Sequence, residues 1–157
     1  MPVVWPPVGT ITGSWTVEIE ASLERVWSVA ADVPASPAWQ PALEQVETLE
    51  TDDEGRSTLV DTSSDAVVRK TKQQLRFSFD EPTGMSWTQI KGDVKSLHGS
   101  WEFIELAAER TRATFALAVD PGRVLGMLLR GPVEGKVKEF LTKGAAEGLK
   151  QHVETAG

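Results

Sequence analysis

Hydrophobic and polar residues alternate along much of the chain. Within residues 10–20, the large apolar residues Trp15, Val17 and Ile19 are separated by polar residues. Successive side chains of a strand point to opposite faces, so this alternation predicts a half-buried strand. Similar β-rich segments predict six further strands, at residues 43–51, 56–63, 67–80, 85–90, 95–106 and 111–120.

The segments that join the last six strands are short and polar. Most contain glycine or proline, at residues 53–55, 82–84, 92–93 and 108–110. Links of this length join neighbouring antiparallel strands. The pattern therefore predicts an antiparallel meander.

A helix is predicted directly after the first strand. Ser22 can cap it, and residues 23–30 place Leu, Val, Trp and Ala at helical spacing up to an end near Asp32. Prolines at positions 34, 37 and 41 then prevent a long helix. We expect at most a short helical turn there, presenting Trp39.

The last predicted element is a helix that opens at Pro132 and runs to about Val153. At ~1.5 Å per residue it is about 30 Å long, enough to cross one face of a curved sheet. Its predicted apolar face carries Val133, Val137, Phe140 and Leu141.

Gly144 and Gly148 fall within the same predicted face, although glycine disfavours helices by about 1 kcal/mol relative to alanine. Either the helix approaches the sheet closely there, or the missing side chains leave room for a guest molecule. The sequence is compatible with both hypotheses.

These elements predict an α+β fold, with a seven-stranded curved antiparallel sheet gripping a long C-terminal helix and two short helices after the first strand. A chain of 157 residues suits one such domain, residues 1–157, with residues 1–9 as a proline-rich N-terminal arm.

Charge and composition narrow the functional classes. The net charge of −7 gives no basic footprint for nucleic acid, so no nucleic-acid partner is expected. The chain has no cysteine, which fits a reducing compartment. No apolar run approaches the roughly 20 residues of a membrane helix, and the N-terminus has no signal-peptide pattern. We expect a cytoplasmic protein, either a monomer or a homodimer.

The order of elements and several local strings resemble the START-like, helix-grip (SRPBCC) superfamily, within it the polyketide cyclase/dehydrase and coenzyme Q-binding-protein branch. The strings lie in the opening helix and its proline-bounded turn, in the central hairpin and in the last strand: residues 24–27, 38–41, 86–87, 92–97, 99–103 and 111–121.

The resemblance implies an elongated pocket between the concave sheet face and the C-terminal helix, holding a lipid, an isoprenoid or quinone, or an aromatic polyketide. Alternation along the strands places rows of aromatic and aliphatic residues on one face. The predicted ligand-binding residues are Trp39, Leu75, Phe77, Trp87, Trp101, Phe103, Phe115, Met127, Leu128, Val137, Phe140 and Leu141. The alternative is that these side chains simply fill a core.

Catalytic machinery is sparse. The chain has two histidines and no tyrosine, and neither a metal-binding spacing nor a phosphate-binding loop is present, so no metal and no cofactor is expected. In the family that the chain resembles, cyclisation relies on pocket shape and a polar side chain that polarises a carbonyl. Arg69 shares the alternation of Leu75 and Phe77, which makes it the candidate for that role.

The sequence is compatible with three functions. The first is a binding protein that carries a hydrophobic small molecule without chemistry. The second is a polyketide cyclase, aromatase or dehydratase acting in the same pocket, and whether the chain is an enzyme stays open. The third is an interaction module with a filled core. The apolar segment 121–130 contacts either the guest or a membrane surface, or forms a packed helical turn.

Overall fold

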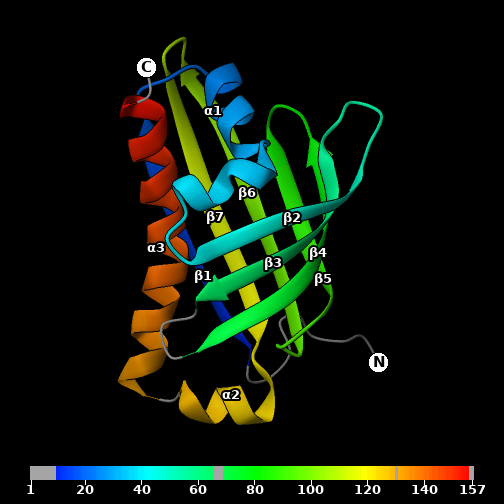
Figure 1. Ribbon diagram of the computed structural model, residues 1–157. Helices are drawn as coiled ribbons and strands as arrows, with labels where there is room; N and C mark the ends of the chain where they lie inside the picture. Colours follow the sequence, from blue (N-terminus) through cyan, green and yellow to red (C-terminus); the bar gives the residue numbers. More distant parts are fainter. Residues whose placement is uncertain (1–9, 66–68, 130, 156–157) are drawn as a thin grey trace, which may run out of the picture.

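One seven-stranded antiparallel sheet forms the body of the protein, as the alternation predicts (Figure 1). The structure is a computed structural model that describes residues 10–65, 69–129 and 131–155. The strands follow the order β1-β7-β6-β5-β4-β3-β2. Their bounds are β1 (Ile11–Ile19), β2 (Leu43–Thr51), β3 (Ser57–Asp65), β4 (Lys70–Asp80), β5 (Gly84–Gly92), β6 (Ser96–Ala107) and β7 (Arg110–Asp120).

The meander is confirmed, and β1 closes it by pairing with β7, so that Trp15 lies opposite Phe115. The predicted N-terminal arm, residues 1–9, and the first two positions of the predicted strand at 67–80 lie outside the described residues.

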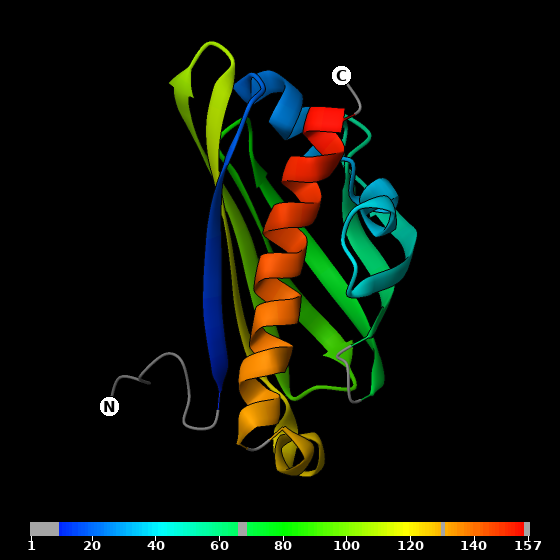
Figure 2. The ribbon, with the colours of Figure 1, turned by 90° about the vertical axis from the view of Figure 1, so that its left-hand side faces the viewer.

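Within the described ranges, four helical segments accompany the sheet: α1 (Leu23–Ala30), the 3-10 helix η1 (Val33–Ala38), α2 (Gly122–Leu128) and α3 (Pro132–Thr155). The predicted cap of α1 is confirmed, because the Ser22 hydroxyl accepts a hydrogen bond from the Arg25 backbone N–H at 3.2 Å. α1 ends at Ala30 rather than near Asp32. Figure 2 shows α3 running along the length of the sheet beside β1.

The main hydrophobic core cluster joins α1 and the C-terminal half of α3 to the sheet. The Trp27 ring meets the rings of Phe79 and Phe103 edge-on, with centroids 6.3 and 6.2 Å apart. The buried face of α3 differs from the predicted one, in that Phe140 and Leu141 are only partly buried. Its fully buried positions are Val137, Thr142, Ala145, Ala146, Leu149 and Val153.

Close packing explains one of the two glycines, Gly144 and Gly148, that fall in the predicted apolar face of α3. A Cβ atom on Gly148 would collide with the backbone carbonyl oxygen of Trp39, whereas one on Gly144 would make an ordinary van der Waals contact, 3.7 Å from Pro41 Cγ. The helix therefore lies close to the segment between η1 and β2, whereas the expected close approach was to the sheet. Neither glycine makes room for a guest.

Gly148→Ala is expected to destabilise the protein by about 1–3 kcal/mol, because the added methyl group must displace the Trp39 backbone. Gly135→Ala is the matched control, since a Cβ atom at this position of the same helix would have no neighbour within 4 Å. It should stabilise by about 0.5–1 kcal/mol through helix propensity. Urea denaturation measures both, and equal effects would contradict this packing.

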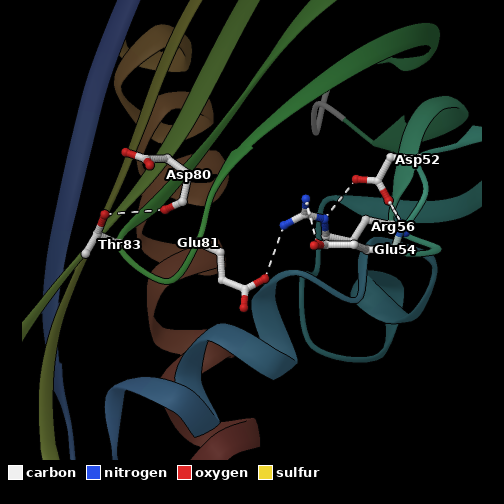
Figure 3. Close-up of polar contacts among 6 residues, drawn as sticks. All are labelled: Asp52, Glu54, Arg56, Asp80, Glu81 and Thr83. Atoms are coloured by element: carbon white, nitrogen blue, oxygen red, sulfur yellow. Dashed lines mark hydrogen bonds and ion pairs between the residues drawn. The ribbon is translucent and has the colours of Figure 1, made fainter.

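Arg56 joins two turns at one end of the sheet (Figure 3). Its guanidinium lies 2.9 Å from a carboxylate oxygen of Asp52, 2.9 Å from one of Glu54 and 3.2 Å from one of Glu81. It also stacks over the Phe79 ring, 4.9 Å from the centroid. The β2–β3 turn is thereby tied to the β4–β5 turn.

Burial acts to raise the pKa of Asp52, but hydrogen bonds from the backbone N–H and guanidinium of Arg56 and the backbone N–H of Glu54 outweigh it, so the pKa lies below its usual value. A carboxyl with a lowered folded-state pKa adds stability above its unfolded pKa, and that stability is lost as pH falls through the folded pKa.

Asp52→Asn is therefore expected to lower the Tm at neutral pH, with the difference from wild type closing as pH falls below about 4. Asp53→Asn, at the exposed neighbouring position, is the charge-matched control. Thermal melts across the acid range measure both variants. A gap for Asp52→Asn that persists at low pH would refute the proposed linkage.

Candidate functional site

A cavity lies between the concave face of the sheet and the N-terminal half of α3. Its volume is about 130 Å³, counted as the space open to the centre of a water molecule. This is smaller than the roughly 300–1,000 Å³ of an ordinary small-molecule pocket. From α3, the side chains of Val137, Lys138, Leu141 and Thr142 line it, and Leu125 of α2 contributes at one end. The cavity is therefore narrow and suits a slim or flat guest.

Aromatic rings from four strands form one wall. Phe77 stacks on Trp87 with centroids 5.3 Å apart, and Trp101 meets Phe115 edge-on at 5.0 Å. Gly99 lies opposite Trp87 in the β5–β6 pair, and a Cβ atom at this glycine would collide with the indole. The missing side chain thus lets the Trp87 ring lie across β6.

Buried polar side chains line the cavity on β3 and β4. Thr62, Thr71 and Gln73 are each 5% exposed. The Gln73 amide donates to the Thr71 hydroxyl oxygen at 2.6 Å, and the Thr62 hydroxyl lies 3.3 Å from the amide oxygen and from the backbone carbonyl oxygen of Gln73. An amide has two N–H donors and this cluster uses one, so a donor remains for a guest.

This polar cluster was missed at the sequence level. A signal was present, because Thr71 and Gln73 share the alternation of Leu75 and Phe77 along the strand.

Lys138 is the only ionisable side chain among the described residues that line the cavity. Its aliphatic stem lies over Gly13 of β1, where a Cβ atom would be 2.7 Å from Lys138 Cγ. Glycine at this position lets α3 approach the edge strand.

The structure brings together seven of the predicted ligand-binding residues at the cavity: Leu75, Phe77, Trp87, Trp101, Phe115, Val137 and Leu141. That they contact a ligand stays a prediction.

The other predicted positions lie away from the cavity. Trp39 and Phe103, 7% and 1% exposed, pack into the core, and Phe140 is partly buried but outside the cavity lining. Met127 and Leu128 are 62% and 52% exposed on α2, whose inward side is occupied by Leu125. A contact of the exposed side of α2 with a membrane surface stays a prediction.

The placement of Arg69 inside the pocket is wrong. Arg69 is exposed and lines a groove outside the cavity, together with Lys95 and Arg123. β4 begins at Lys70, so Arg69 precedes the strand, and the alternation that placed it with Leu75 does not extend to it.

Residues 10–65, 69–129 and 131–155 contain no cluster of three or more metal-ligating side chains. No helix in this part of the chain has the length and apolar character to cross a bilayer.

Comparison with known proteins identifies the family. Residues 19–143 match the family model described as polyketide cyclase / dehydrase and lipid transport. No curated protein sequence matches the chain.

Similar solved structures share the fold. A START superfamily protein from Mycobacterium smegmatis is 20% identical, with a TM-score of 0.81 over 93% of this chain and 99% of that one. A protein from Thermus thermophilus is 21% identical, with a TM-score of 0.79 over 93% and 99%. The Zhui aromatase/cyclase from Streptomyces sp. R1128 is 20% identical, with a TM-score of 0.74 over 94% and 98%. The START-like fold is therefore shared at low sequence identity.

Gln73→Met is expected to destabilise the protein by about 1–2 kcal/mol, because it leaves the buried Thr71 hydroxyl without its amide partner. Gln74→Met, on the opposite face of β4, is the control and should change stability by less than about 0.5 kcal/mol. Chemical denaturation compares the two. A neutral Gln73→Met would show that the cluster contributes nothing to stability.

Proposed function

Because the chain belongs to the polyketide cyclase/dehydrase and lipid transport family, we propose that it binds and carries an apolar, ring-bearing small molecule in the cavity beneath α3. The observation that carries this proposal is the wall of Phe77, Trp87, Trp101 and Phe115 that lines the cavity. Aromatic side chains bury large apolar areas and favour stacked or edge-on contacts with other rings.

The narrowness of the cavity supports a flat guest. Met85, Leu97 and Leu117 also line the cavity, and none of them carries a ring. Methionine is unbranched and flexible, so it adapts to neighbours of different shape. A guest larger than the resting space is accommodated by movement of these side chains.

The cavity favours the carrier over an interaction module with a filled core. The side chains that border an unfilled apolar space lose the packing contacts that a filled core would supply. A domain that acted only through its outer surface would be more stable if larger side chains filled this space. A guest molecule that occupies it would offset the loss by ligand-linked stabilisation.

A cyclase or dehydratase acting on a polyketide-like guest is the second candidate. The unused donor of the Gln73 amide favours it, because a hydrogen bond to a guest carbonyl would polarise that group. The carrier is preferred because general acid–base catalysis needs a titratable group at the guest. Among the described residues that line the cavity, Lys138 alone is ionisable.

Leu117→Trp is expected to fill the cavity and weaken binding of the neutral fluorescent probe N-phenyl-1-naphthylamine at least about 10-fold, because the larger side chain occupies the guest's space. Leu49→Trp adds the same ring at a position that is 42% exposed and outside the cavity, and should leave binding unchanged.

Fluorescence titration measures the probe, and Tm values confirm that both variants fold. Native mass spectrometry of the wild type, purified from its own host, identifies a co-purifying guest. An absence of probe binding to folded wild-type protein would refute the carrier proposal.

A further inference from the structure

We infer that the guest is an amphiphile with an acidic head group, and that the head lies outside the cavity at a basic mouth formed by Arg69, Lys95 and Arg123. This inference rests on the proposed function, because it assumes that the apolar part of the same molecule occupies the cavity. It specifies the chemical class of the ligand and its orientation.

The basic mouth lies next to the cavity. The groove that contains the three cations shares Thr71, Val94, Pro121 and Leu125 with the cavity lining. These shared residues come from β4, from the β5–β6 turn and from the start of α2. A molecule that extends past these four side chains would contact both the cavity and the groove.

The charges at the mouth run against those of the whole chain. The net charge is −7, yet the described lining of the groove contains three cations and a single carboxylate, that of Asp93. This carboxylate already accepts a hydrogen bond from the Lys72 backbone N–H at 2.8 Å. The mouth is therefore a local site of positive charge that an anion would complement.

The two arginines at the mouth are available to a ligand. The third cation, Lys95, differs from them, because its Nζ lies 3.9 Å from an Asp120 carboxylate oxygen, a distance at the limit of an ion pair. Arg69 and Arg123 form no salt bridge with any described residue. A guanidinium can donate two parallel hydrogen bonds to a carboxylate, sulfonate or phosphate group.

Polarity falls from the mouth into the cavity. Arg69, which directly precedes β4, is exposed, and the inward residues of the strand are then Thr71 and Gln73, followed by Leu75 and Phe77. Charged, neutral polar, aliphatic and aromatic positions thus follow in order. This gradient matches a molecule whose acidic head remains in water while its rings lie among the aromatic wall.

Two probes with the same aromatic skeleton test the inference. 8-Anilinonaphthalene-1-sulfonate carries a sulfonate, and N-phenyl-1-naphthylamine lacks it. In the double variant Arg69→Gln/Arg123→Gln, the Kd of the sulfonate probe should rise about 5- to 10-fold, as expected for two exposed charge contacts. The Kd of the neutral probe should stay unchanged. Added salt should weaken only the sulfonate probe in the wild type.

The matched control is Arg76→Gln/Arg112→Gln, which removes the same charge from exposed positions that do not line the cavity or the groove. It should leave both probes unchanged. Competition between the two probes must show that they share one site. Tm values establish folding, and the single variant Arg123→Gln repeats the test if the double variant is unstable.

The outcomes separate the two proposals. If the neutral probe does not bind the folded wild type, the proposed function fails and this inference fails with it. If the neutral probe binds but the sulfonate probe is insensitive to the mouth variant, the inference alone is overturned. It is also overturned if Lys138→Met, rather than the mouth variant, selectively weakens the sulfonate probe, because the head would then lie against α3.

Discussion

The close contact between α3 and the chain segment after η1 fixes the rest of the architecture. Gly148 lets the helix backbone reach the Trp39 carbonyl, and the buried residues Ala145, Ala146 and Leu149 follow the same half of the helix into the core. Because an α-helix is a stiff rod, seating one half determines where the other half lies. The N-terminal half therefore spans the sheet over the cavity.

The cavity exists because the two ends of the concave face are packed differently. Near α1, the rings of Trp27, Phe79 and Phe103 fill the space against small residues of α3. Toward α2, the inward positions of β3 and β4 carry hydroxyl and amide groups that hydrogen-bond to one another. Such groups cannot fill space as an aromatic ring does, and their unused hydrogen-bonding capacity favours a polar guest atom or water.

Family membership and local chemistry constrain function to different degrees. The family and the fold are shared by proteins with different ligands and activities, so they do not identify the guest of this chain. The residues that line the cavity constrain the guest more closely. Their rings favour an apolar, flat molecule, and the scarcity of ionisable groups in the described lining favours binding over proton transfer. The mouth is positively charged although the chain as a whole is negative, and this local charge is the basis of the inferred orientation of the guest.

The sequence by itself determined the seven-strand meander, the capped first helix and the long last helix, because periods of two and of 3.6 residues follow directly from backbone geometry. It also determined the inward row that contains Leu75 and Phe77. Tertiary structure decided which apolar residues line the cavity and which, like Phe103, lie in the core. Alternation along a strand predicts which face of the sheet a residue lies on, but it does not predict which elements pack against that face. Arg69 was misplaced because a strand's exact first residue is set by its pairing partners, and periodicity holds only inside the strand.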